Sequence, residues 1–162
     1  MYKAAIEKAP ERESLYSKMG FALANLNRAQ EAVAALEKSV QLNPKNAESF
    51  YLLGDLYSEL KRPEESINAY KRSLELNPKQ KEVHYNLGTV YAEREQLQEA
   101  LQEIKVAVEL DPSYAQAWSN LAIVSEKLGL DEPAIEAHEK VVSLGRAQAG
   151  NSECRKFQNG AS

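Results

Sequence analysis

The sequence predicts an all-α solenoid of antiparallel helix pairs. Four kinds of residue recur at a step of 34 residues, and the apolar residues between them follow helical spacing. The recurring prolines are Pro10, Pro44, Pro78 and Pro112, and the small residues are Gly20, Gly54, Gly88 and Ala122. A large ring or its substitute recurs at Tyr16, Phe50, His84 and Trp118, and leucine at Leu42, Leu76, Leu110 and Leu144.

Residues 47–80 illustrate how one period folds. Apolar residues from Phe50 to Leu60 fall at steps of three and four, so they line one face of a first helix. Pro63 suits the first turn of a second helix, because its missing N–H is not needed there. Asn77 precedes a proline and is therefore disfavoured in helical conformation, which ends the second helix. Each period is predicted to form two helices joined by a tight turn.

The small residues lie in the middle of each first helix, where a glycine costs about 1 kcal/mol relative to alanine. A cost that recurs at a fixed step indicates that the two helices of a pair approach closely at this position. We expect the large residue three or four places away to fill the adjacent groove.

The period divides the chain into units at 13–46, 47–80, 81–114 and 115–148. Residues 1–12 match the second helix of a truncated repeat, and the exposed face of this orphan helix would favour a homo-oligomer. Either the chain was cut from a longer array, or this helix caps the array. The unit 115–148 is degenerate and is predicted to cap the other end, since Ser125, His138 and Arg146 replace its tyrosine, ring and proline. Residues 149–162 are expected to be a polar tail, with a capping helix over 147–157 as the alternative.

Within this pattern, Phe50-x2-Leu53-Gly54-x2-Tyr57, followed by Ser66, Tyr70, Ser73 and Pro78, resembles the signature of the tetratricopeptide repeat (TPR) family. His84-x2-Leu87-Gly88-x2-Tyr91 resembles it as well. The resemblance extends from residue 1 to about residue 145. It implies a right-handed superhelix whose first helices line a concave groove, and it is specific for the fold rather than for a function.

Composition excludes several classes of partner. The net charge is −4 and the isoelectric point is near 5.4, which disfavours non-specific binding to nucleic acid or to anionic membranes. A lone cysteine, Cys154, cannot form an internal disulfide, and the N-terminus lacks the apolar core of a signal peptide. These features indicate a cytoplasmic protein. Neither metal-ligand spacing nor a phosphate-binding loop occurs in the sequence, so we expect no cofactor and no enzyme activity.

The groove that the resemblance implies would bind a peptide segment of another protein. Its leading contacts are predicted to be Tyr51, Asp55, Tyr85, Asn86, Thr89 and Asn120. Because acidic residues outnumber lysines along this surface, a neutral or basic peptide is favoured. The cations of a chaperone-binding carboxylate clamp are missing from the matching positions, so that type of binding is rejected.

Asn86 and Asn120 are one period apart and resemble two rungs of the asparagine ladder in the repeats of O-GlcNAc transferase. An amide side chain offers both a donor and an acceptor to the main chain of an extended peptide. The alternative is ordinary polar surface.

Three functional hypotheses follow. The chain is a scaffold or adaptor that binds a peptide in its groove, a regulatory or substrate-recruiting part of a larger enzyme such as a glycosyltransferase, or a self-assembling structural module.

Overall fold

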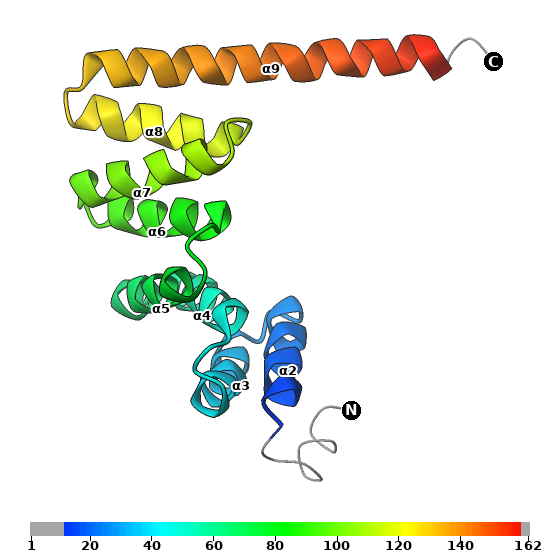
Figure 1. Ribbon diagram of the computed structural model, residues 1–162, viewed down its shortest axis with the longest axis vertical. Helices are drawn as coiled ribbons and strands as arrows, with labels where there is room; N and C mark the ends of the chain where they lie inside the picture. The colour runs from blue at the N-terminus through cyan, green and yellow to red at the C-terminus, as the bar shows by residue number, and fades with distance from the viewer. Residues whose placement is uncertain (1–11, 160–162) are drawn as a thin grey trace.

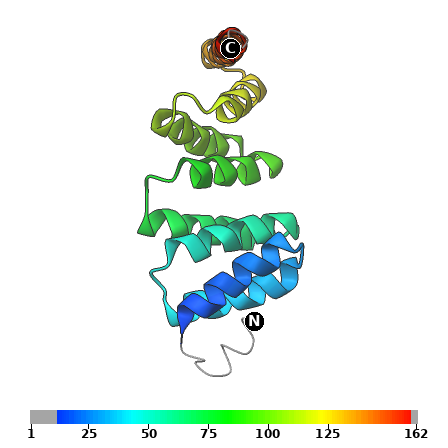
Figure 2. The same ribbon diagram turned by 90° about the vertical axis from the view of Figure 1, so that its right-hand side faces the viewer.

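The computed structural model describes residues 12–159, with side chains described as far as Ala147. Within this range eight helices follow one another without strands, and they stack as consecutive antiparallel pairs (Figures 1 and 2). The first helices are α2 (Glu13–Asn25), α4 (Ala47–Glu59), α6 (Lys81–Glu93) and α8 (Ala115–Lys127). The second helices are α3 (Ala29–Leu42), α5 (Pro63–Leu76), α7 (Leu97–Leu110) and α9 (Asp131–Asn159). The predicted all-α solenoid of helix pairs is confirmed.

Two predictions for the N-terminus, the orphan helix over 1–12 and the association through it, fall on residues 1–11, outside the described range. Among the described residues, no helix has both the length and the apolar character that crossing a membrane requires.

In the pairs that begin with α2, α4 and α6, the two helices touch at the recurring glycine, and Ala122 takes the equivalent position in α8. A Cβ atom added at Gly54 would lie 2.4 Å from the ring of Tyr70, and one at Gly88 would lie 2.6 Å from Cγ1 of Ile104. Leu36 occupies the same place opposite Gly20. The predicted close approach is therefore confirmed. The side chain against each glycine comes from the second helix. Phe50 and Trp118 of the ring column are partly buried and pack against the core, and their filling of the adjacent groove stays a prediction.

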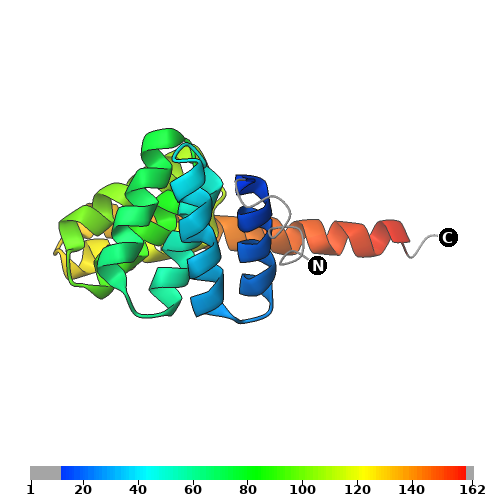
Figure 3. The same ribbon diagram turned by 90° about the horizontal axis from the view of Figure 1, so that it is seen from below.

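The end of each second helix is set by an Asn-Pro or Asp-Pro step. Asn43, Asn77 and Asp111 have non-helical backbone angles, and the side chain of each accepts the N–H two residues later. Arg146 stands where the next proline would be, and α9 continues past it to Asn159 in place of a separate polar tail. Its far end projects beyond the stacked pairs (Figure 3). Without the proline, nothing at this position stops the helix.

The last pair also departs from the others in its core. The column that contains Tyr57 and Tyr91 ends in Ser125. The hydroxyl of Ser125 is buried and has no hydrogen-bond partner within the described part of the chain.

The turn inside each pair places one residue in the left-handed region. These residues are Asn27, Lys61, Glu95 and Gly129, again 34 residues apart, with φ between 56° and 69°. In each turn the next residue donates its N–H to a carbonyl of the preceding helix, as Arg62 does to Tyr57 at 2.8 Å. Left-handed geometry favours glycine, yet two of the four turns use lysine or glutamate.

Replacing Lys61 with glycine is therefore expected to stabilise the protein by about 1 kcal/mol, because the strain of a left-handed lysine is removed. Gly129→Ala is the matched opposite change. A Cβ there meets nothing within 4 Å, so its expected cost of about 1 kcal/mol comes from the backbone alone. Urea unfolding of the two variants measures both effects. Two changes of the same sign would contradict this interpretation.

His84, in the ring column, is held between two acceptors. Its Nδ1 lies 2.7 Å from a carboxylate oxygen of Glu103, and its Nε2 lies 3.0 Å from the carbonyl oxygen of Pro78. Only the doubly protonated ring donates to both. Burial acts to lower the pKa of His84, but these two contacts outweigh it and raise the pKa above its usual 6.5.

Because the pKa of His84 is raised in the folded state, protonation of His84 stabilises the fold. This stabilisation is complete below about pH 6.5 and is lost as the pH rises through the folded-state pKa. The melting temperature should therefore fall over this window. In His84→Phe, which carries the ring found at Phe50, this part of the pH dependence should disappear. Thermal melts from pH 6 to 9 provide the measurement, and parallel curves for the two proteins would rule out the ionic role of His84.

Candidate functional site

The first helices present a common surface, here called the first-helix wall. It is formed by three columns of side chains at steps of 34 residues along α2, α4, α6 and α8. Neighbouring first helices contact one another directly, which brings these columns into register. The columns are Ser17, Tyr51, Tyr85 and Ser119; Lys18, Leu52, Asn86 and Asn120; and Phe21, Asp55, Thr89 and Ile123. All six predicted contact residues lie on this wall.

Asp55 lies at the centre of the wall and joins two repeats. The Tyr70 hydroxyl donates to Asp55 Oδ1 at 2.6 Å, and Asn86 Nδ2 donates to the same oxygen at 2.9 Å. Burial raises the pKa of Asp55, although both hydrogen bonds act to lower it. The ring of Tyr51 lies beside Tyr70, with 6.4 Å between the two ring centroids. Burial, and then the charge of Asp55, raises the pKa of Tyr51 to about 12.

An equivalent bridge joins the next two repeats. Asn120 Nδ2 donates to Thr89 Oγ1 at 3.2 Å, and Thr89 in turn donates to the carbonyl oxygen of Tyr85 at 3.0 Å. Asn86 and Asn120 thus each use an amide N–H to bind the preceding repeat. This places a constraint on the ladder hypothesis, because one N–H of each amide is already used, and each asparagine keeps its carbonyl oxygen and its second N–H for a ligand.

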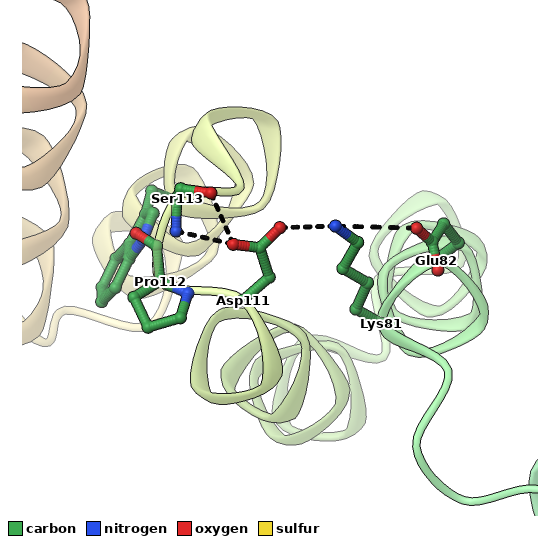
Figure 4. Close-up of polar contacts among 6 residues, drawn as sticks. Lys81, Glu82, Asp111, Pro112 and Ser113 are labelled. Atoms are coloured by element: carbon green, nitrogen blue, oxygen red, sulfur yellow. Dashed lines mark hydrogen bonds and ion pairs between the residues drawn. The ribbon is translucent and has the colours of Figure 1, made fainter. Parts of the chain in front are cut away.

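A polar cluster lies at the start of α6, one helical turn before Tyr85, and joins Lys81 to Asp111 (Figure 4). Lys81 Nζ donates to Asp111 Oδ2 at 2.5 Å, and Ser113 donates its N–H and its hydroxyl to Asp111 Oδ1. These contacts, that of Lys81 first, lower the pKa of Asp111 to about 2. The cluster fixes the turn before α8 and therefore Tyr114, whose ring packs 5.0 Å from that of Tyr85.

Two hollows open on the wall, one near each end. The first, of about 310 Å³, lies between α2 and α4 and is lined by residues that include Lys18, Phe21 and Leu52. The second, of about 270 Å³, lies between α6 and α8 and is lined by residues that include Asn120, Ile123 and Lys127. The predicted leading contacts did not include Phe21 and Ile123. The period places both residues in one column with Asp55 and Thr89, so the sequence aligns them with the groove, but it does not show that they border hollows.

Within the described residues, no cluster of histidine, cysteine or carboxylate side chains could hold a metal ion.

Comparison with known families assigns the fold. A family model described as the cytochrome c-type biogenesis protein H TPR domain matches residues 35–150, and a tetratricopeptide repeat model matches residues 13–46. The chain belongs to the tetratricopeptide repeat family. Tetratricopeptide repeats stack into extended surfaces, so membership indicates a protein-interaction scaffold in general terms. The comparison with curated protein sequences gives no match.

Solved structures of other TPR proteins share this architecture. A crystal structure of MamA is 23% identical with a TM-score of 0.89, over 92% of this chain and 87% of MamA. A MamA structure covering residues 41 to the end, from Desulfovibrio magneticus RS-1, is 26% identical with a TM-score of 0.84. That match covers 91% of this chain and 83% of the MamA chain. These similarities concern the fold.

Asp55→Asn tests the electrostatic state of the wall. The variant keeps an acceptor oxygen for Tyr70 and Asn86 but removes the half-buried charge, so it should be more stable than the wild type at pH 7. The folded-state pKa of Asp55 is raised, so the folded state favours the protonated carboxyl. The stability that protonation of Asp55 adds is fully present below about pH 3.8, and it is lost as the pH rises through the folded-state pKa.

The stability difference between Asp55→Asn and the wild type should therefore shrink as the pH falls from 7 toward 4, as urea unfolding would measure. A difference that grows on acidification would mean that the hydrogen bonds outweigh burial and that the pKa is lowered.

Proposed function

We propose that this chain is a scaffold that holds an extended segment of a partner protein along the first-helix wall. The leading contacts are those predicted from the sequence, Tyr51, Asp55, Tyr85, Asn86, Thr89 and Asn120. The observation that carries the proposal is the pair of hollows between neighbouring first helices, one on either side of these residues. A segment that lies across the wall would contact the hollows and the polar centre together.

The polar groups at the centre suit a peptide main chain. The carbonyl oxygens of Asn86 and Asn120 are acceptors for N–H groups of an extended segment, which has donors free because it pairs with no strand. Tyr51 and Tyr85 are half-buried and add ring surface, and tyrosines are frequent among the residues that dominate binding energy.

The negative charge of the first-helix wall favours a neutral or basic partner segment. Glu48 and Glu82 flank the two tyrosines, and both glutamates are exposed. An acidic segment would be repelled here, whereas a basic one would be attracted from a distance.

The same geometry favours binding of a partner segment over catalysis. Asp55, the half-buried carboxyl of the wall, is already engaged by Tyr70 and Asn86. Its role is therefore to join repeats, and we assign it no proton transfer to a substrate.

The experiment is a selection of random peptides on the wild type, with segments of cytochrome c included because of the name of the matched family model. The double variant Tyr51→Ser, Tyr85→Ser should bind the selected peptides with an affinity lowered about tenfold or more, as expected when hot-spot residues are removed. Ile135→Ser with Val142→Ser, on α9 away from the wall, is the matched control and should leave affinity unchanged.

Calorimetric titration measures each affinity, and a circular dichroism melt verifies that each variant is folded. Equal affinity of the selected peptides for the wall variant and for the wild type would refute the proposal.

A further inference from the structure

The first-helix wall differs between its centre and its ends. The two central repeats carry glutamate at both edges of the wall and tyrosine between them, whereas the outer repeats carry a large apolar residue in the column of Asp55 and Thr89. The central glutamates are Glu48, Glu59, Glu82 and Glu93. The outer apolar residues are Phe21 and Ile123.

The acidic centre has little internal compensation. All four central glutamates are exposed, and within the described residues only Glu82 has an ion-pair partner, Lys81, at 3.8 Å. Lys81 is much closer to Asp111, at 2.5 Å. The pKa of Tyr51 is raised by burial and then by the charges of Asp55 and Glu82, which agrees with a negative potential at this place. The centre therefore favours a cation.

The ends of the wall are suited to apolar groups. Phe21 is 53% exposed and Ile123 is 51% exposed, although each lies beside a hollow. Half-buried Leu52 lines the first hollow, and buried Val124 lines the second. Covering such side chains is worth about 25 cal/mol for each Å² of apolar surface removed from water. Charged residues also line both hollows, Lys18 and Glu48 in the first and Glu93, Glu95 and Lys127 in the second. The apolar part of each hollow, beside Phe21 or Ile123, therefore favours a bulky apolar side chain.

The distance between the hollows determines how many residues separate the two apolar side chains of the ligand. They are two repeats apart, since one lies between α2 and α4 and the other between α6 and α8. Packed helices lie about 8–10 Å apart, which puts the hollows about 16–20 Å apart. An extended chain covers that length in about five or six residues. A helical ligand would need about 11–13 residues, at 1.5 Å each.

We infer that the partner segment is extended, with a lysine or arginine at its centre and a bulky apolar residue at each end, about five or six positions apart. This inference rests on the proposed function and adds the chemistry of the ligand to it. The central cation lies among the glutamates and against the tyrosine rings, where an ion pair and a cation–π contact reinforce each other. The two apolar residues enter the hollows beside Phe21 and Ile123.

An extended segment is preferred to a helix because the centre offers acceptors for main-chain N–H groups, which a helix has already used. Asn86 and Asn120 keep their carbonyl oxygens for this purpose, since each hydrogen bond to the preceding repeat uses only an amide N–H.

The test uses peptides selected on the full chain, followed by a double-mutant cycle. Peptides should be enriched in the pattern apolar, basic, apolar. Phe21→Ser and Ile123→Ser should each weaken binding about tenfold, as should alanine at either apolar position of the peptide. If a protein residue and a peptide residue are in contact, substituting both should lower the affinity no more than the larger of the two single substitutions does. Such a cycle also gives the direction in which the peptide lies.

Charge is tested separately. Glu59→Gln with Glu93→Gln should weaken binding and reduce its sensitivity to salt, because fewer charges attract the central cation. Glu109→Gln with Glu136→Gln, exposed positions on second helices, is the matched control and should change neither property.

The possible failures are distinguishable. Peptides that lose affinity for the Tyr51 and Tyr85 variant but lack paired apolar residues, or whose apolar positions lie about 11–13 apart, would overturn this inference and leave the proposed function standing. Additive effects throughout the double-mutant cycle would overturn it in the same way. If no peptide is enriched, or if no wall variant alters the affinity of those selected, both this inference and the proposed function fail.

Discussion

The structure depends on a close contact within its helix pairs. In the pairs that begin with α2, α4 and α6, a glycine of the first helix lies against one side chain of the second helix. At Gly54 the ring of Tyr70 occupies the space that any Cβ atom would take. The same contact recurs at Gly20 and Gly88, with an aliphatic side chain in place of the ring. Since these pairs are set by this approach, the spacing and angle of the whole stack follow from a contact repeated every 34 residues.

The same contact prepares the wall for a ligand. The ring of Tyr70 fills the gap at Gly54 and puts its hydroxyl 2.6 Å from Asp55, whose oxygen also accepts from Asn86 of the next pair. Packing within one pair, joining of neighbouring pairs and orientation of an asparagine on the wall are therefore one connected arrangement. A substitution at Gly54 would disturb all three.

Sequence alone predicted the helix pairs well, because their signals are local. A proline after an asparagine ends a helix wherever it occurs, and helical spacing identifies the buried face. The left-handed turns at Lys61 and Glu95 could not be predicted in this way, since neither residue type favours that geometry. Arg146 was recognised as a lost proline, but the signal was interpreted as decay of the repeat and not as the loss of a helix stop.

The six wall residues were found through their columns, which give position but not contacts. That Asp55 is bonded to Tyr70 depends on a partner 15 residues away on another helix, and no spacing rule supplies it. The hollows were missed for a related reason. A volume between two helices depends on the side chains of both, and the period identifies equivalent positions without saying how much space lies between them.

Ser125 has a consequence for how the array opens. A buried hydroxyl without a partner costs about 1–3 kcal/mol, and that cost falls on the pair formed by α8 and α9. This pair should therefore open locally more often than the pairs formed by α4 to α7. Its amide protons are then expected to exchange with solvent earlier.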